Sequence, residues 1–371
     1  RSWKVIQHVR EKVSCRDCET ISQAPAPFHV IPRGWAGPSL LAMILFEKYG
    51  QHQPLNRQAE RYAREGVELS LSTLADQVGH CAVALAPLVE RLRAYVMSAE
   101  RLHGDDTTVP VLARGKTDTA RSWVYVRDDR PFGGTGPPAA MFFYSRDRTG
   151  SHVHEHLEGW SGILQADAYA GFRALYEPGP DGTVRVREAA CWAHLRRDFH
   201  DVWKGTASPI ARDALEQIGK LYDIEAAING QPRDVRLAMR KKESAPKVEA
   251  FRLWCERALT QIPGKGDLAK AMRYALTRWK SFTLFLEDGR VAIDNNAAER
   301  AMRPVATGRR NWTFAGSDEG GRRAAAIYTL IETAKLNDTD PLAWLADLLA
   351  RLQDHPAKRI DELMPWNWRQ Q

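Results

Sequence analysis

The spacing of apolar residues predicts helices in the first third of the chain. From residue 36 to about residue 103, apolar positions recur at intervals of three and four. The stretch "LNRQAERYAREGVELSLSTLADQVG" (55–79) predicts two helices that meet at Gly66, with Ser70 or Ser72 capping the second helix. Such a pair fits a helix-turn-helix and an ordinary helical hairpin equally well.

The pattern changes after Gly104 to β-branched and aromatic runs separated by polar, Gly and Pro residues. Three of these runs predict an antiparallel meander of strands: "TTVPVLA" (107–113), "SWVYVRD" (122–128) and "AMFFYS" (140–145). Helices and strands should then alternate: helix "SHVHEHLEGW", strand "GILQA", helix "AYAGFRALYE", strand "TVRVREA" and helix "CWAHLRRDFHDVW". This order predicts an α+β fold whose core is a ribonuclease-H-like (integrase-like) mixed sheet.

A long helical block, from about residue 200 to residue 290, lies between the last predicted strand and the helix that carries Glu299. It keeps the helical spacing and offers no strand candidate, as an inserted subdomain would. The C-terminal segment predicts an amphipathic helix and a Trp-rich end that pack onto the core. We therefore expect six parts: a Cys-containing module and Pro-rich linker (1–35), a helical, helix-turn-helix-like DNA-binding region (36–103), the first part of the core (104–200), a helical insertion (201–290), the final core helix with an acid (291–340) and the C-terminal helix and tail (341–371).

The composition indicates a polyanionic partner. The 371 residues include 53 Lys and Arg against 46 Asp and Glu, a formal charge of +7. The longest apolar run, "SLLAMILF" (39–46), is much shorter than the ~20 residues of a membrane-spanning helix, so we predict a buried helix and no membrane partner. Five cysteines, an odd number, favour a reducing, cytoplasmic location. Because the first residue is Arg1, we expect a piece of a longer protein.

Three acidic positions lie where a ribonuclease-H-like sheet brings acids together: on the first strand, just after the fourth strand and on the final helix. Here these positions hold Asp105 or Asp106, Asp167 and Glu299. Clustered carboxylates suit Mg²⁺ or Mn²⁺, and two such ions can activate water or a 3′-hydroxyl for attack on phosphate. Taken singly, the Asp residues also fit turn or helix caps, and Glu299 fits a helix-start acid paired with Arg303.

Longer stretches carry a family resemblance: "GDDTTVPVLA", "GILQADAYAGF", "CWAHLRRDFHD", "DNNAAERAMRPVATGRRNWTFAGS" and "DELMPWNW". With the helical pair at 55–79 they span nearly the whole chain, which resembles insertion-sequence transposases of the insertion sequence sixty-six family, within the DDE superfamily. The resemblance implies cleavage at the 3′ ends of an insertion sequence and strand transfer, dependent on Mg²⁺ or Mn²⁺, with ligands on Asp105, Asp167 and Glu299. Members usually show Asp-Glu-Thr where this chain has Asp-Asp-Thr, so Asp106 is assigned as the neighbour of the ligand.

The same resemblance implies a set of partners. Double-stranded DNA is expected both as the terminal repeats of the element and as the target, in a bacterial, nucleoid-associated setting. A homodimer or larger assembly is expected because two ends must be joined, and accessory proteins of the element are further candidates. Two other functions stay open on this fold: a catalytically inactive transposase-derived DNA-binding regulator, and a ribonuclease-H-like structure-selective nuclease.

Basic and aromatic residues are the candidate DNA contacts, because the arginine fork suits phosphate and aromatic rings stack on unpaired bases. On the first helix of the helical pair they are Arg57, Arg61 and Arg64. Near the third acid they are Arg300, Arg303, Arg309, Arg310, Asn311 and Trp312. For Trp312, a place in the core is an equally good interpretation.

A zinc site is implied only in part. The resembled family carries a zinc-binding element with two Cys-x-x-Cys pairs, and this chain has one pair, Cys15 and Cys18, with His8 as the nearest further ligand. Residues 1–35 therefore look like a truncated zinc-binding element. A half-site with Zn²⁺ and two free thiols in a loop are both open, since zinc needs four ligands.

Three other motifs have plainer explanations. "GKT" at 115–117 lacks the Gly five positions earlier that a phosphate loop needs. The histidines of "HVHEH" (152–156) do not have zinc-protease spacing and should lie on a solvated helix face. Cys191 and His194 share one helix face without a third partner, so we assign Cys191 to the core.

Overall fold

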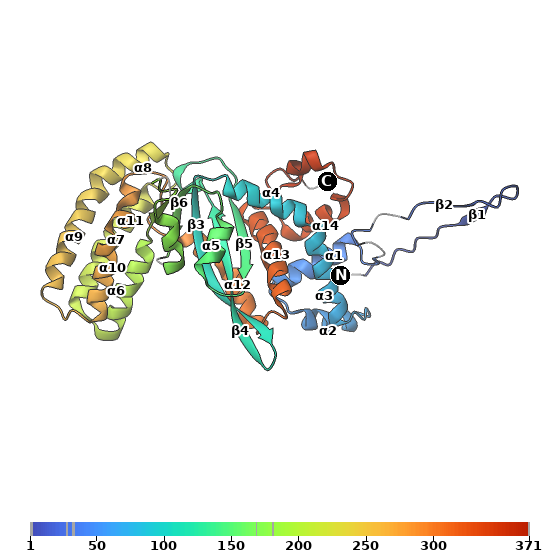
Figure 1. The fold of residues 1–371 in the computed structure, drawn as a ribbon, viewed down its shortest axis with the longest axis horizontal. Coiled ribbons are helices and arrows are strands. Elements are labelled where there is room, and N and C mark those ends of the chain that lie inside the picture. The colour runs from blue at the N-terminus through green and yellow to red at the C-terminus, as the bar shows by residue number, and fades with distance from the viewer. Residues whose placement is uncertain (1–2, 27–28, 32–33, 168, 180–181, 370–371) are drawn as a thin grey trace.

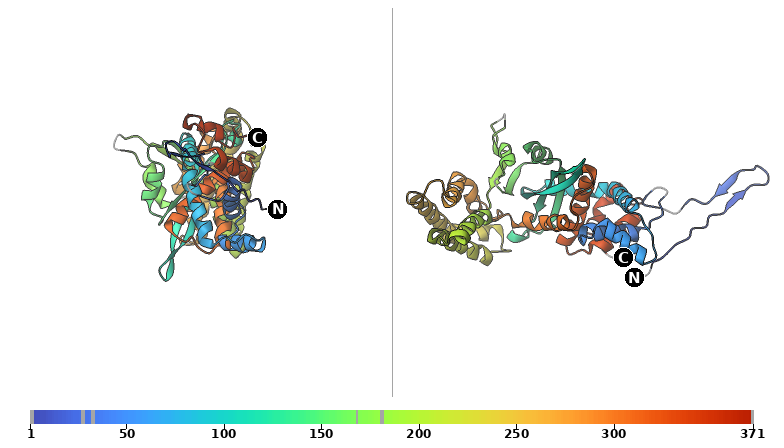
Figure 2. Two further views of the ribbon diagram at one scale, coloured as in Figure 1. Left: turned by 90° about the vertical axis from the view of Figure 1, so that its right-hand side faces the viewer. Right: turned by 90° about the horizontal axis from the view of Figure 1, so that it is seen from below.

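The computed structural model describes residues 3–26, 29–31, 34–167, 169–179 and 182–369. A central sheet separates two helical blocks, and the three parts lie in a row (Figure 1). A block from the middle of the chain lies at one end, and the terminal helices lie at the other. A thin β-hairpin from the N-terminal region projects beyond the terminal helices (Figure 2).

The central sheet has five strands: β3 (Arg101–Ala113), β4 (Lys116–Arg127), β5 (Ala139–Ser145), β6 (Gly162–Ala166) and β7 (Val186–Ala189). Their order across the sheet is β5-β4-β3-β6-β7. The first three form the antiparallel meander that the sequence predicts, while β6 runs parallel to β3 and β7 runs parallel to β6. The protein is therefore a mixed α+β structure, as predicted at that level.

Helix α13 (Asp318–Leu336) covers the outer edge of β5. Thr333 Oγ1 accepts a hydrogen bond from the Ala140 N–H at 3.1 Å, and Thr329 Oγ1 accepts one from the Phe142 N–H at 2.9 Å. An uncovered edge strand presents unpaired backbone groups to other chains. These threonines therefore close the sheet on this side.

One face of the meander carries α5 (Gly150–His156) and the short 3₁₀ segment η3 (Ala170–Tyr176), whereas the 3₁₀ segment η2 (Arg130–Phe132) lies between β4 and β5 in the chain, with Phe132 beside Arg101. An α-helix was predicted for 168–177, and that prediction is wrong for the described residues, which form η3; position 168 lies outside them. The segment is short and contains Gly171, which lowers helix propensity, and short helical pieces often adopt 3₁₀ geometry.

The terminal helices pack together beside the sheet. They are α1 (Pro38–Leu45), the π-helical η1 (Phe46–Gly50), α2 (Leu55–Arg64), α3 (Leu71–Ala84), α4 (Ala86–Met97), α14 (Pro341–Arg351) and the 3₁₀ segment η6 (Ala357–Leu363). Helix α1 is largely buried, and Ser70 caps α3 by accepting a hydrogen bond from the Thr73 N–H at 3.0 Å, both as predicted. The tail packs onto the core through the fully buried Trp344. The C-terminal segment is not one continuous helix: α14 ends at Arg351 and η6 follows Pro356, a residue that disfavours a helix running through it.

The helical insertion forms the block at the other end of the molecule. Its elements are α6 (Trp192–Thr206), α7 (Pro209–Ala227), α8 (Arg233–Met239), the π-helical η4 (Arg240–Ser244), α9 (Ala245–Leu259), α10 (Asp267–Thr277), α11 (Trp279–Thr283) and the 3₁₀ segment η5 (Leu284–Leu286). Within the fully described stretch 201–290 no strand occurs, as predicted. The block has its own core, in which the buried Arg240 pairs with Glu225 at 2.7 Å.

The N-terminal hairpin consists of β1 (Lys12–Ser14) and β2 (Ile21–Gln23), paired antiparallel. The predicted Pro-rich linker includes positions 27–28 and 32–33, which lie outside the described residues. Among the helices of the described residues, none combines the length and apolarity that a membrane crossing needs.

Candidate active site

The register of two parallel strands brings Asp105 and Asp167 side by side. Gly104 on β3 pairs with Ala166 at the C-terminal end of β6. Asp105 follows Gly104 and Asp167 follows Ala166, so the two acids lie next to each other where β6 ends. Side chains alternate along a strand, so Asp105 shares its face of β3 with His103 and Thr107. Helix α12 (Asn296–Asn311) crosses this face and carries Glu299 in its first turn.

Asp106 points to the other face of β3 and is neutralised there. Its carboxylate accepts hydrogen bonds from Arg121 at 3.1 Å and from Arg148 at 2.7 Å. Asp105 has no arginine of its own in the described part of the chain; its Oδ1 accepts a hydrogen bond from the Asp106 N–H at 2.8 Å. Two neighbouring acids thus have opposite environments, and Asp105 is the one that faces the other acids.

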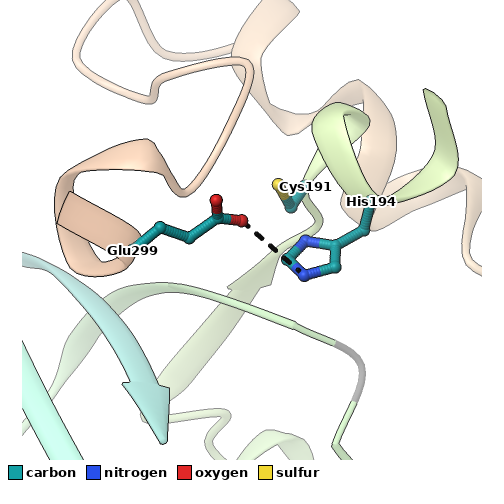
Figure 3. A group of neighbouring side chains, drawn as sticks. All are labelled: Cys191, His194 and Glu299. Carbon is teal, nitrogen blue, oxygen red and sulfur yellow. Dashed lines mark ion pairs between the residues drawn. The ribbon is translucent and has the colours of Figure 1, made fainter. Parts of the chain in front are cut away.

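Two acids from distant parts of the chain, Asp167 and Glu299, lie beside His194 of helix α6. Its Nε2 lies 3.8 Å from the Asp167 carboxylate and 3.7 Å from the Glu299 carboxylate. Arg197, one turn along α6, lies 3.5 Å from Glu299. The pair of Glu299 with Arg303 that the sequence suggested is not found among the described residues. The side chain of Glu299 instead points toward the insertion (Figure 3).

The acids repel one another. Burial, followed by the charges of Asp106, Glu299 and Asp167, raises the pKa of Asp105 from 3.8 to about 7. Such a set of oxygen donors fits Mg²⁺ or Mn²⁺, whose positive charge would offset the repulsion. In the described structure the ligand atoms of Asp105, Asp167 and Glu299 are not all within 4.8 Å of one another, in keeping with repulsion between carboxylates.

A buried polar network joins the three elements that carry the acids. Asn295 donates a hydrogen bond to the Gly104 carbonyl at 2.8 Å, and its Oδ1 lies 3.1 Å from His103 Nδ1. On β6, Gln165 donates to the Ala292 carbonyl at 2.8 Å and accepts from the Ala292 N–H at 2.9 Å. Arg101 connects the contacts of Asn295 with those of Gln165, because its Nη1 lies 2.5 Å from His103 Nε2 and 3.4 Å from Gln165 Oε1. The sequence analysis missed these residues.

The start of α12 explains why Asn295 is available to this network. Asn295 is the residue before α12, but its side chain makes no capping hydrogen bond. Asp294, one residue earlier, accepts a hydrogen bond from the Asn296 N–H at 3.1 Å. The side chain of Asn295 is fully buried instead. The amide is therefore a structural link between α12 and β3.

Cys191 and His194 do have a third partner, so that expectation is wrong. Ligand atoms of Cys191, His194 and Glu299 lie within 4.8 Å of one another (Figure 3). The partner was missed because Glu299 is over one hundred residues away in sequence. Cys191 is buried, as predicted, and burial raises the pKa of its thiol to about 12.

The residues of α12 beyond Glu299 divide into exposed and structural groups. Arg300, Arg303, Arg310 and Asn311 are exposed. Arg309 is held inward, because its Nη1 donates to Thr108 Oγ1 at 2.5 Å and to Thr107 Oγ1 at 3.2 Å. Trp312 packs partly against the core, with the Lys48 ammonium 4.7 Å from its ring centroid. DNA contacts by these residues stay predictions.

The N-terminal candidates also differ in their surroundings. Arg57 and Arg64 on α2 are exposed, whereas Arg61 pairs at 2.7 Å with Glu47, a buried acid. Cys15 and Cys18 are exposed in the turn of the projecting hairpin. Cys18 Sγ donates to Thr20 Oγ1 at 3.1 Å, and hydrogen bonds with Thr20 lower the pKa of this thiol. In the described residues, no group of three metal ligands includes this pair.

Two of the plainer interpretations can be compared with the structure. In "GKT", Gly115 lies in the tight turn between β3 and β4, and Lys116 and Thr117 begin β4, which is not the strand-to-helix turn of a phosphate loop. His156 is not on a solvated face: it is buried and stacks on Phe143 with ring centroids 4.2 Å apart, because α5 lies on an aromatic patch of the sheet. His154 is exposed as expected.

Comparisons with known proteins cover nearly the whole chain. A family model described as "Transposase IS66 family" matches residues 33–323, and one described as "IS66 C-terminal element" matches residues 329–366. The uncharacterized protein y4hP of Sinorhizobium fredii is 51% identical over 381 residues, covering 100% of this chain and 69% of the relative. The uncharacterized protein y4qI of the same organism is 41% identical over 375 residues, covering 99% of this chain and 69% of the relative.

Proposed function

This chain belongs to the Transposase IS66 family, and from that premise we propose that it is a DDE-type DNA transposase that cuts the 3′ ends of an insertion sequence and joins them to target DNA. The observation that carries the proposal is the meeting of three acids around one edge of the sheet. Asp105 comes from β3, Asp167 follows β6 and Glu299 lies on α12. No covalent intermediate with the enzyme is required.

The arrangement of strands supports a ribonuclease-H-like core. In the order β5-β4-β3-β6-β7, three antiparallel strands are followed by two parallel ones. One acid lies on β3, the first of these strands in the chain, and another follows β6, the fourth in the chain. The helical block from α6 to η5 lies between β7 and α12 in the chain. We propose that the insertion contributes to the active site through α6, whose His194 and Arg197 contact Glu299.

The three carboxylates would hold two divalent ions. When bound, such ions lower the pKa of a water or 3′-hydroxyl nucleophile and neutralise charge on the phosphate undergoing in-line displacement. The protein supplies the geometry: the network of Asn295 and Gln165 fixes the elements that carry the acids. Arg121 and Arg148 keep Asp106 out of the pocket by holding it on the other face.

A row of arginines continues from the acids along α12. At 3.6 residues per turn, Glu299, Arg303 and Arg310 fall on one face of the helix. Both arginines are exposed. This row would hold a DNA backbone whose scissile phosphate lies at Glu299, because arginine binds phosphate oxygens with two parallel hydrogen bonds.

The helical pair α2 and α3 is the proposed reader of the element ends. Arg57 and Arg64, seven residues apart, share one exposed face of α2. Arg61 lies near that face but is held by Glu47. Since two element ends must be joined in one event, we propose that the protein works as a dimer or larger assembly.

The deciding experiment uses the full chain, Mg²⁺ and a labelled duplex that carries the terminal repeats flanking the coding sequence. We expect a free 3′-hydroxyl at the repeat end and, with target DNA, a joined product. Asp105→Asn, Asp167→Asn and Glu299→Gln should abolish both products and keep the gel shift. Asp201→Asn is the matched control, because Asp201 is an exposed acid on α6 outside the cluster.

The outcomes separate three functions. A joined product that requires all three acids supports the transposase. A gel shift without cleavage, insensitive to Mg²⁺, would mean a DNA-binding regulator. Cleavage of branched DNA without joining would mean a structure-selective nuclease. Full activity of Glu299→Gln would remove the catalytic role of the cluster.

A further inference from the structure

We infer that Cys191, His194 and Glu299 form a binding site for a transition-metal dication of the zinc class, in addition to the carboxylate site for Mg²⁺. One thiol, one imidazole and one carboxylate converge with ligand atoms within 4.8 Å of one another. Zn²⁺ and Co²⁺ bind sulfur and nitrogen readily, whereas Mg²⁺ prefers oxygen. This inference concerns metal binding and does not depend on strand transfer.

The local sequence has the spacing of a metal-binding pair. Cys191 is the residue before α6, and His194 follows in its first turn, a Cys-x-x-His arrangement. At this place both side chains project from one end of the helix toward the segment that carries Glu299 (Figure 3). Short spacings of this kind are common among zinc ligands because they place two donors on one side of a turn.

Backbone donors surround the sulfur. The Asn295 N–H donates to Cys191 Sγ at 3.2 Å, and the backbone N–H groups of His194 and Ala193 also point at it. Backbone donors and a helix N-terminus both stabilise negative charge on sulfur. When a metal coordinates the sulfur, the thiol proton leaves to solvent.

The imidazole has an unused nitrogen at this place. His194 Nδ1 is buried and has no hydrogen-bond partner among the residues that the structure describes, which is costly for a polar atom. A metal ion on Nδ1 would satisfy it and leave Nε2 facing the carboxylates of Asp167 at 3.8 Å and Glu299 at 3.7 Å. A carboxylate beside the second nitrogen orients imidazole ligands in metal sites. Three protein ligands leave a position open for water or a phosphate oxygen.

Cobalt spectroscopy tests this site directly. The full chain is prepared with Cys15→Ser and Cys18→Ser, which removes the exposed thiols. On titration with Co²⁺ we expect visible d–d bands and a sulfur-to-cobalt charge-transfer band that saturate at one ion per chain and disappear when Zn²⁺ is added. Absence of the charge-transfer band would overturn the inference.

Two further substitutions assign the sulfur and nitrogen ligands, and a third is the control. Cys191→Ser should abolish the charge-transfer band, and His194→Ala should weaken Co²⁺ binding by at least the ~10–100-fold typical of losing an outer-shell partner. Cys255→Ser is the matched control, because Cys255 is a buried thiol in the core of the insertion. Circular dichroism confirms folding of each variant. Should the band survive Cys191→Ser, or binding be unchanged in the folded His194→Ala protein, the site is refuted.

Discussion

Replacing Asp105 by Asn should stabilise the protein at neutral and alkaline pH. In the folded protein the pKa of Asp105 is about 7, whereas an unfolded chain has the ordinary value of 3.8. The folded state therefore binds a proton that the unfolded state releases between these values. Stability contributed by this group is present below pH 3.8 and is lost as pH rises to 7, because the ionised carboxylate is buried beside other acids.

The size of the effect follows from the two pKa values. One pKa unit corresponds to about 1.4 kcal/mol, so the difference sets an upper limit of about 4 kcal/mol. Partial exposure of Asp105 to solvent reduces this to about 2 kcal/mol. Asn keeps the oxygen that accepts the Asp106 N–H hydrogen bond and lacks the charge. The variant should therefore gain about 2 kcal/mol at pH 8 and almost nothing near pH 4.

Urea unfolding in EDTA, followed by circular dichroism from pH 4 to pH 8, measures this difference. Asp118→Asn is the control of opposite sign, because hydrogen bonds from Lys116 and Arg146 lower the pKa of Asp118. Its contribution to stability is present above its unfolded pKa, so this variant should lose stability at pH 8. If Asp105→Asn gains nothing at pH 8, or gains the same amount at every pH, the carboxylate is not strained by its neighbours. Saturating Mg²⁺ should stabilise the wild type and not Asp105→Asn.

Three other predictions concern the surroundings of the acids. Asn295→Ala should lower the rate of strand cleavage at least tenfold and leave the gel-shift affinity unchanged. The reason is that a displacement of ~1 Å in a catalytic group can lower the reaction rate about 100-fold. Equal cleavage rates in the variant and the wild type would contradict a positioning role for Asn295. Arg303→Ala should weaken DNA binding and lower the slope of log binding constant against log salt concentration by about one. Arg309→Ala should chiefly reduce thermal stability, since Arg309 donates a hydrogen bond to β3. Similar slopes for the two variants would show that Arg303 is not a phosphate contact distinct from Arg309. Thr333→Val should cost about 1–3 kcal/mol in urea unfolding by leaving the Ala140 N–H unpaired.

The elements of the sheet could be predicted because their patterns are local. Alternating apolar residues and breaks set the three strands of the meander, and Ser70 marked the start of α3. Predictions failed where tertiary contacts decide the outcome. His156 looked solvated on a polar stretch, yet an aromatic patch of the sheet buries it. The segment at η3 had helical spacing, but it is short and contains Gly171.

For the candidate site, too, residues could be predicted from local patterns, whereas contacts between residues far apart in sequence could not. Acids at expected places in the strand and helix order could be named from sequence. His194 could not be placed beside Glu299, since the contact depends on how the insertion folds back on α12. The burial of the Asn295 amide against Gly104 likewise depends on how α12 meets β3, two elements far apart in sequence. Buried amides leave no periodic signal, because each is defined by the partner it meets.

The two faces of β3 show how the protein can tolerate a cluster of acids. On one face, Asp106 is fully compensated by Arg121 and Arg148. On the other face, Asp105 has no such arginine within the described residues, and its charge raises the free energy of the folded state. The buried network of Asn295 and its partners offsets this repulsion, since each hydrogen bond holds an acid-bearing element in place without neutralising the acid. A pocket built in this way would attract cations, because no arginine in the described part of the chain offsets the charge of Asp105.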